Sequence, residues 1–135
     1  MVLRVVFFLL LFTCTLCLAA DNSTASSNST DVSEEIKSMI NDHKVTLFSK
    51  TYCPYSKKIK RLLEPYKIED MKVVEVDLRS DRKLVQDELA KYSHIHTVPQ
   101  LFVDHKFVGN SDTVGELERN NKLRPILQAA HAISN

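Results

Sequence analysis

The residue best suited to chemistry in this sequence is Cys53, which lies between a strand pattern and a helix pattern. Residues 45–48 form an apolar, β-branched run that predicts a buried strand. Residues 57–63 carry apolar side chains at helical spacing, with lysine and arginine on the opposite face. Pro54 suits the first turn of that helix, because the N–H that proline lacks would have no partner there. Cys53 is therefore expected at or beside the helix N-cap, on a tight turn after the strand.

This position favours a reactive thiolate. Unpaired amides and the positive end of the helix dipole stabilise an anion, and Lys50 adds a nearby cation. An ordinary cysteine, with a pKa of about 8.5, is only about 3% thiolate at pH 7, so the gain in reactive species is at most about thirtyfold. A sulfur of low pKa is also a good leaving group when a second thiol attacks its mixed disulfide. Cys53 is thus predicted to form and release mixed disulfides, rather than to pack as a small hydrophobic residue.

Composition bounds the class of protein. The chain has 135 residues, enough for one domain with additional sequence, and its 18 basic and 17 acidic residues nearly balance. This balance argues against a nucleic-acid-binding protein.

The first 20 residues resemble a targeting segment. Arg4 is their only charge, and residues 5–20 form an apolar run that ends in small residues. Residues 1–20 are predicted to be a secretory signal peptide or, if retained, a signal-anchor. The protein is then expected in the lumen of the secretory pathway (endoplasmic reticulum or Golgi) or outside the cell, attached to a membrane only if the segment is retained.

Residues 21–33 are rich in Ser, Thr and Asn and are expected to form a flexible linker before a folded domain at 34–135. Asn22 and Asn28 each begin a glycosylation sequon. Cys14 and Cys17 have the spacing of a redox motif but lie in the apolar leader, where no folded turn can activate them. Cys53 is therefore expected to be the only thiol of the mature domain, without a structural disulfide.

The elements that position Cys53 can be placed from periodicity and capping residues. The expected order is helix, strand, helix, strand, helix, strand, strand, helix, helix. The second strand, at 73–76, is apolar enough to suggest a central, parallel position, and 101–103 and 106–108 suggest a hairpin. Ser80-Asp81 and Ser111-Asp112 are expected to cap helices. The class is therefore α/β, with a four-stranded mixed sheet flanked by helices, and sites of such sheets form at the carboxyl ends of strands.

Three motifs in this order resemble those of a glutaredoxin over residues 34–132: Cys53-Pro54-Tyr55-Ser56, Thr97-Val98-Pro99 and Gly109-Asn110-Ser111-Asp112. The resemblance implies a thioredoxin-like fold, a cis peptide before Pro99, and glutathione as co-substrate of a thiol–disulfide oxidoreductase. The partners that it implies are glutathione and glutathionylated or disulfide-bearing proteins, and we expect a monomer. The implied glutathione-binding residues are Lys50, Tyr55, Gln86, Thr97, Val98, Pro99, Ser111 and Asp112.

Two residues depart from the family pattern. Ser56 stands where many members have a second cysteine, so Cys53 has no internal partner and the resemblance implies the monothiol route, in which Cys53 deglutathionylates or glutathionylates proteins. Asn110 stands where a second glycine is usual; asparagine tolerates a positive φ, so the turn is expected to survive there.

Two alternative functions remain. Cys53 could ligate a glutathione-held [2Fe-2S] cluster between two subunits, because thiolates bind iron–sulfur clusters. The domain could instead retain client proteins through mixed disulfides. His94-Ile95-His96 lacks the other ligands of a metal site, so no other metal is expected, and His96 could instead supply a pH-dependent cation near the site.

Overall fold

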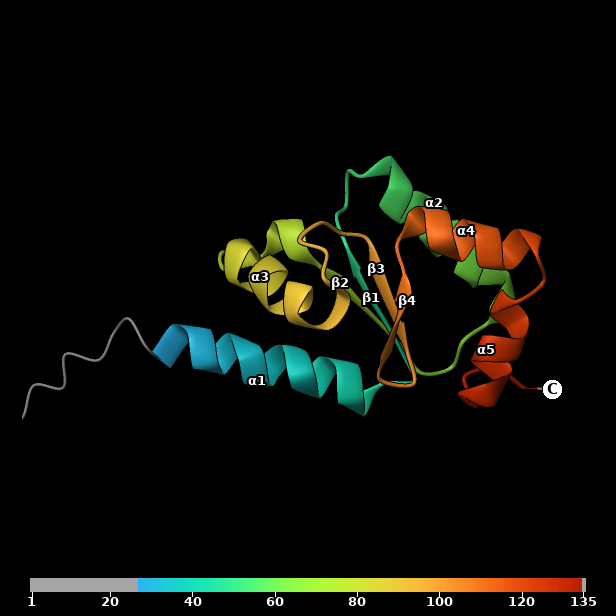
Figure 1. Ribbon diagram of the computed structural model, residues 1–135, viewed down its shortest axis with the longest axis horizontal. Helices are drawn as coiled ribbons and strands as arrows, with labels where there is room; N and C mark the ends of the chain where they lie inside the picture. Colours follow the sequence, from blue (N-terminus) through green and yellow to red (C-terminus); the bar gives the residue numbers. More distant parts are fainter. Residues whose placement is uncertain (1–26, 135) are drawn as a thin grey trace, which may run out of the picture.

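The computed structural model describes residues 27–134 of the chain (Figure 1). Its helices and strands, in chain order, are α1 (Ser27–Asp42), β1 (Val45–Ser49), α2 (Pro54–Leu63), the 3-10 helix η1 (Glu64–Tyr66), β2 (Met71–Glu75), the 3-10 helix η2 (Val76–Leu78), α3 (Arg82–Ser93), β3 (Gln100–Val103), β4 (Lys106–Gly109), α4 (Ser111–Arg119) and α5 (Leu123–Ala129). The predicted class and order of elements are confirmed.

The sheet has four strands in the order β2-β1-β3-β4. β1 runs parallel to β2, with Ser49 opposite Glu75, and antiparallel to β3, which forms the predicted hairpin with β4. β2 is parallel as expected, but the prediction that it is central is wrong. It lies at the edge and leaves Val73 39% exposed. Its apolar run reflects the buried Val74 and Val76, the latter already in η2, rather than a strand with two neighbours.

Helices cover both faces of the sheet (Figure 1), and each face has its own apolar core. Val45 and Leu47 of β1 pack on the face covered by α2, α4 and α5. Phe48 packs on the face covered by α1 and α3, where its ring meets Phe102 edge-to-face at 5.7 Å. This alternation follows the two-residue period of a strand and holds β1, the strand that leads to Cys53, between both cores.

α1 begins at Ser27, earlier than the sequence predicts. The flexible linker expected at 21–33 is therefore wrong for residues 27–33. Val32 is buried in the core, and Ser33 donates to Glu88 of α3 at 2.9 Å. The expected leader at 1–20, residues 21–26, Cys14, Cys17 and Asn22 lie outside the described residues, and Asn28 belongs to the first turn of α1. No helix within residues 27–134 is long and apolar enough to cross a membrane.

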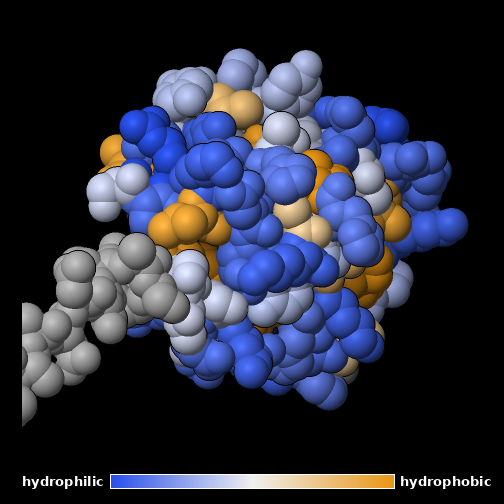
Figure 2. Space-filling model, turned by 60° about the vertical axis from the view of Figure 1, so that its left-hand side comes forward, coloured by the Kyte–Doolittle hydropathy of each residue, from blue (hydrophilic) through white to orange (hydrophobic). Residues whose placement is uncertain are grey.

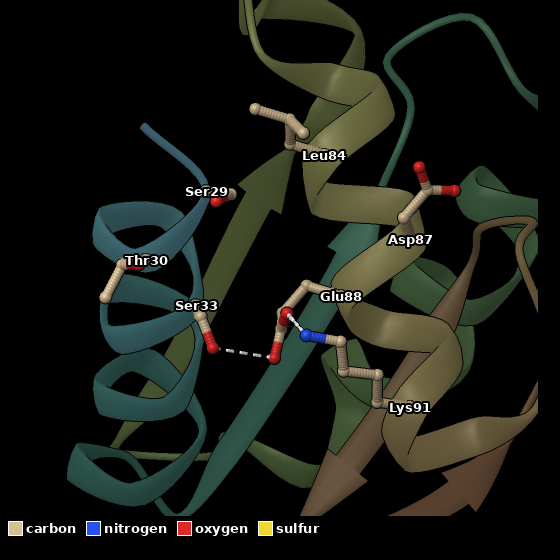
Figure 3. A pocket seen from close by; sticks show the side chains of 7 residues that line it. All are labelled: Ser29, Thr30, Ser33, Leu84, Asp87, Glu88 and Lys91. Carbon is tan, nitrogen blue, oxygen red and sulfur yellow. Dashed lines mark hydrogen bonds and ion pairs between the residues drawn. The ribbon is translucent and has the colours of Figure 1, made fainter. Parts of the chain in front are cut away.

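Polar contacts join α1 to α3. A pocket of about 310 Å³ opens between the two helices, where the buried Glu88 points toward Ser33 and Lys91 (Figure 3). Arg79, which follows η2, donates to Glu35 of α1 and to Asp81, the N-cap residue of α3. The face around the N-terminal end of α1 is largely hydrophilic, with small apolar patches (Figure 2). The hydrogen bonds of Arg79 fix η2, which borders the loop that carries Cys53.

Candidate active site around Cys53

Three segments meet at the end of the sheet where β1 and β2 have their carboxyl ends. β1 ends at Ser49 and leads into the loop with Cys53. The antiparallel β3 begins at this same end of the sheet, directly after Val98 and Pro99. The Val98–Pro99 peptide is cis, as the resemblance implies. β4 ends here at Gly109 and leads into α4. This arrangement agrees with the general rule that sites form at the carboxyl ends of parallel strands.

Cys53 is the N-cap residue of α2, and Pro54 begins the helix. Its backbone is extended (φ −74°, ψ 122°), its N–H donates to the Lys50 carbonyl at 3.2 Å, and its carbonyl accepts from the Lys57 amide at 3.1 Å. The side chain makes no capping bond, so the sulfur stays available, and it is partly exposed. The predicted position is confirmed, and Cys53 is a free cysteine.

The surroundings of Cys53 favour the thiolate. Burial is the strongest single influence and raises the pKa of the thiol, because a charged sulfur is less well solvated there. Hydrogen bonds from the Ser56 amide and hydroxyl and from the Tyr55 amide, together with the charge of Lys50, lower it by more. The net effect is a Cys53 pKa below its ordinary value, in the direction that the sequence predicts.

Ser56 contributes a bond that the sequence does not reveal. Its side chain is fully buried, and its oxygen accepts the Lys50 amide at 3.1 Å. That bond fixes the position of the hydroxyl, which contributes to the lowered pKa of Cys53. Ser56 therefore does more than replace a second cysteine, because it links the start of the loop to the thiolate.

Asp77 of η2 is a second residue that sequence reasoning missed. Its carboxylate accepts from both the amide (2.9 Å) and the hydroxyl of Thr51. These bonds lower the pKa of Asp77, with a further contribution from Lys50. Only the parallel pairing of β1 with β2 could have predicted this contact, since it places the residues after the two strands side by side.

A pocket of about 160 Å³ lies at this end of the sheet, lined by Tyr55, two residues after Cys53, and by Thr97, Val98, Pro99, Asn110, Ser111 and Asp112. Six of these residues belong to the predicted site. The hydroxyl oxygen of Ser111 is buried and has no hydrogen-bond partner among the described residues. A buried, unpaired hydroxyl at the N-terminus of a helix can receive an anionic ligand.

Asn110 behaves differently from the prediction. Its φ is −88°, and the positive φ belongs to Gly109 (157°), where an added Cβ would lie 2.5 Å from the Cβ of Thr113. Asn110, rather than Ser111 or Asp112, is the N-cap residue of α4, and its side-chain oxygen Oδ1 accepts from the backbone amides of Asp112 (3.0 Å) and Thr113 (3.1 Å). The turn thus needs glycine only at 109.

Two of the predicted glutathione-binding residues, Lys50 and Gln86, do not line the pocket, and neither does Cys53. Lys50 lies in the loop before Cys53, where its charge acts on the sulfur and on Asp77. The side-chain amide of Gln86 donates to the His96 carbonyl at 2.7 Å, which braces the segment before Thr97. His96 is 71% exposed, and its ring nitrogen lies 3.3 Å from Asp87.

Comparison with known proteins yields one family. The family model for glutaredoxin matches residues 45–108. An uncharacterized monothiol glutaredoxin of Caenorhabditis elegans is 46% identical over 103 residues, which cover 76% of this chain and 70% of that protein. Glutaredoxin-C2 of Arabidopsis thaliana is 37% identical over 101 residues, which cover 75% of this chain and 90% of that protein.

Solved structures agree with the sequence relatives. The crystal structure of a buckwheat glutaredoxin–glutathione complex matches with a TM-score of 0.74 and 29% identity, covering 81% of this chain and 98% of the other. Reduced glutaredoxin C1 from Populus tremula x tremuloides matches with a TM-score of 0.72 and 36% identity, covering 79% of this chain and 91% of the other. The expected thioredoxin-like fold is therefore confirmed.

Proposed function

Because this chain belongs to the glutaredoxin family of glutathione-dependent thiol–disulfide oxidoreductases, we propose that it exchanges glutathione with protein disulfides through Cys53 alone. One observation carries this proposal. The partly exposed Cys53 sulfur, with its pKa lowered, lies at the N-terminus of α2 next to a pocket, and the hydroxyl of Ser56 takes the place of a second thiol.

The proposed reaction has two exchange steps. The Cys53 thiolate attacks the glutathione sulfur of a glutathionylated protein, so that a Cys53–glutathione disulfide forms and the protein leaves as a thiolate. The thiolate of a second glutathione then attacks the glutathione sulfur bound to Cys53. Glutathione disulfide leaves, and the Cys53 thiolate is restored. In sum, one glutathione thiol is consumed, one protein thiol is released, and the mixed disulfide of the protein is exchanged for glutathione disulfide. The reverse sequence glutathionylates the protein.

The pocket offers groups that match glutathione. The Ser111 hydroxyl and the N-terminus of α4 would receive the γ-glutamyl carboxylate, and Asp112 would receive its ammonium group. The backbone of Val98 would pair with the cysteinyl part, with Thr97 and Pro99 beside it.

The other half of the site concerns the sulfur and the glycine end of glutathione. Tyr55 would lie beside the ligand's sulfur. Lys50 would attract the glycine carboxylate, and Gln86 would reach it by exchanging its bond to the His96 carbonyl. The complex of the buckwheat relative with glutathione supports this choice of ligand.

The place of action is part of the proposal. The apolar leader and the Ser/Thr/Asn-rich segment after it support delivery to the secretory lumen. Asn22 and Asn28 would then be accessible to glycosylation. A single reactive thiol in an oxidising compartment depends on glutathione in both directions of the reaction.

Three measurements on the chain test the function. Alkylation of Cys53 as a function of pH is expected to show a pKa below that of free cysteine. The wild type is also expected to reduce the mixed disulfide of glutathione with 2-mercaptoethanol in the presence of glutathione, whereas Cys53→Ser is inactive. Mass spectrometry should show one glutathione adduct on Cys53. Full turnover by Cys53→Ser would disprove the proposal.

A glutathione-held [2Fe-2S] cluster is the alternative that uses the same sulfur. Such a cluster needs four ligands, and Cys53 is the only cysteine within residues 27–134. Two copies of Cys53 and two glutathione thiolates would supply these four ligands, whereas disulfide exchange needs one chain only and remains the function that we propose. The visible absorption of the protein as purified distinguishes the two, because an iron–sulfur cluster is coloured.

A further inference from the structure

Two exposed apolar side chains belong to the loop of Cys53 and to η2, which is hydrogen-bonded to that loop. Leu78 is 74% exposed and Tyr52 is 67% exposed, the two highest values among the large apolar side chains of residues 27–134. A single exposed leucine needs no explanation, but exposed apolar groups beside a reactive centre suggest a contact surface. We refer to Tyr52 and Leu78 as the apolar flank.

The apolar flank is held together by the bonds between Thr51 and Asp77. Tyr52 follows Thr51 and Leu78 follows Asp77, and the Asp77 carboxylate accepts two hydrogen bonds from Thr51. Because β1 and β2 are parallel neighbours, the segments that follow them leave the sheet at the same end. The two side chains therefore belong to one surface, next to Cys53.

This surface lies on the side of Cys53 opposite the glutathione pocket. The sheet order is β2-β1-β3-β4, and η2 with Leu78 follows β2. The pocket residues come instead from the segment before β3 and from the start of α4 after β4. The Cys53 loop, which follows β1, separates the two.

We propose that the apolar flank contacts the polypeptide part of a glutathionylated protein, at an apolar side chain next to the modified cysteine. This inference rests on the proposed function. The γ-glutamyl and cysteinyl parts of glutathione take the pocket on the β3 and β4 side, and its glycine end reaches Lys50 and Gln86, so Tyr52 and Leu78 are the exposed apolar side chains left for the polypeptide. During exchange the glutathione sulfur lies between the sulfur of the protein substrate and that of Cys53. The polypeptide therefore has to come close to Cys53. An extended segment with an aliphatic neighbour would bury part of Leu78 there.

Two glutathionylated peptides test this contact. They differ only in the residue after the modified cysteine, which is leucine in one and serine in the other, and the glutathione–2-mercaptoethanol disulfide serves as a substrate without a polypeptide. For the wild type we expect kcat/KM to be about fivefold higher with the leucine peptide, from partial burial of two apolar side chains. Leu78→Ser should remove this preference, whereas Leu78→Met should keep it.

Leu84→Ser is the matched control, because Leu84 is also exposed (38%) but lines the pocket between α1 and α3. It should keep the preference for the leucine peptide, and Leu78→Ser should keep wild-type kcat/KM with the small disulfide. The inference is overturned if the wild type shows no preference, if Leu78→Ser retains it, or if Leu78→Ser loses the small substrate equally. A wild type that cannot use the small disulfide at all refutes the proposed function itself, and the apolar flank with it.

Discussion

At the scale of single residues, the reactivity of Cys53 depends on the hydroxyl of Ser56. In the sequence, Ser56 is notable only because many members of the family have a second cysteine there. Ser56→Ala removes the hydroxyl that helps to lower the pKa of Cys53 and leaves the Lys50 amide without its acceptor. The pKa of Cys53 should therefore rise toward its ordinary value. The alkylation rate as a function of pH should shift to higher pH, and turnover should fall more at about pH 6 than at about pH 8.5.

Ser38→Ala is the control for this change, since Ser38 is an exposed serine of α1 bonded only to Asp42. It should leave the pH profile of alkylation unchanged. The free energy of unfolding also depends on the pKa of this thiol. A thiol whose pKa is lowered by folding adds stability above its ordinary pKa and loses it as the pH falls through the lowered value. An unchanged alkylation profile in Ser56→Ala would contradict the role of its hydroxyl.

Asn110 sets how many amides of α4 are free for a ligand. Its side chain occupies the amides of Asp112 and Thr113 at the wall of the pocket. Asn110→Gly should free both amides at a cost of only a few tenths of a kcal/mol (roughly 0.3) in stability, and should bind glutathione more tightly. Asn110→Asp should keep the cap but weaken binding, because its carboxylate would repel that of the γ-glutamyl group. Calorimetric titration with glutathione measures both, and weaker binding by Asn110→Gly would show that Asn110 contacts the ligand directly.

At the scale of elements, Arg79 ties α1 to the start of α3. The bonds from Arg79 hold the pKa values of Glu35 and Asp81 below their usual range. Arg79→Met should cost about 1 kcal/mol at neutral pH, a modest value because Glu35 is partly exposed and screened by water. Carboxylates with lowered pKa values stabilise the fold above their ordinary pKa, and this contribution disappears as the pH falls through the lowered values.

Urea unfolding at about pH 7 and about pH 3 tests this dependence, since the ordinary pKa values of carboxyl groups lie at about 4. The deficit of Arg79→Met should shrink at the lower pH. Lys83→Met, which removes the exposed pair of Lys83 with Asp87, should leave the free energy of unfolding nearly unchanged at both pH values. A deficit of Arg79→Met that is equal at both pH values would mean that packing, rather than charge, joins the helices.

Local patterns explain which elements could be predicted. The strand before Cys53, the helix after Pro54 and the hairpin of β3 and β4 are encoded by short-range periodicity and turn residues, and all three are found. The early start of α1 and the edge position of β2 depend on tertiary partners. Ser33 meets Glu88, which is far away in sequence, and only the pairing of β1 with β3 moves β2 to the edge.

At the scale of the whole molecule, the site combines a local part with a non-local part. The environment of Cys53 comes from neighbouring residues, namely Lys50, Tyr55 and Ser56, so the direction of its pKa shift could be predicted from sequence. The pocket comes from separate segments, and the family resemblance identified most of its lining. The Asp77 contact and the capping role of Asn110 could not be predicted, because each depends on side-chain geometry in the finished fold.

The non-local part depends on the aromatic cluster under the sheet. Phe102 is buried, with ring centroids at 5.7 Å from Phe48, 6.3 Å from Tyr92 and 5.5 Å from Phe107, and it belongs to β3, directly after the cis-Pro99 segment. Phe102→Ala should lower the free energy of unfolding by about 3–5 kcal/mol, and Phe102→Leu by less, because the smaller cavity costs less. Since the Cys53 environment is local, the pH dependence of alkylation in the folded Phe102→Leu variant should match that of the wild type. Urea unfolding and alkylation measure these effects. A shifted thiol pKa in Phe102→Leu would mean that the core, and not the loop alone, sets the reactivity of the sulfur.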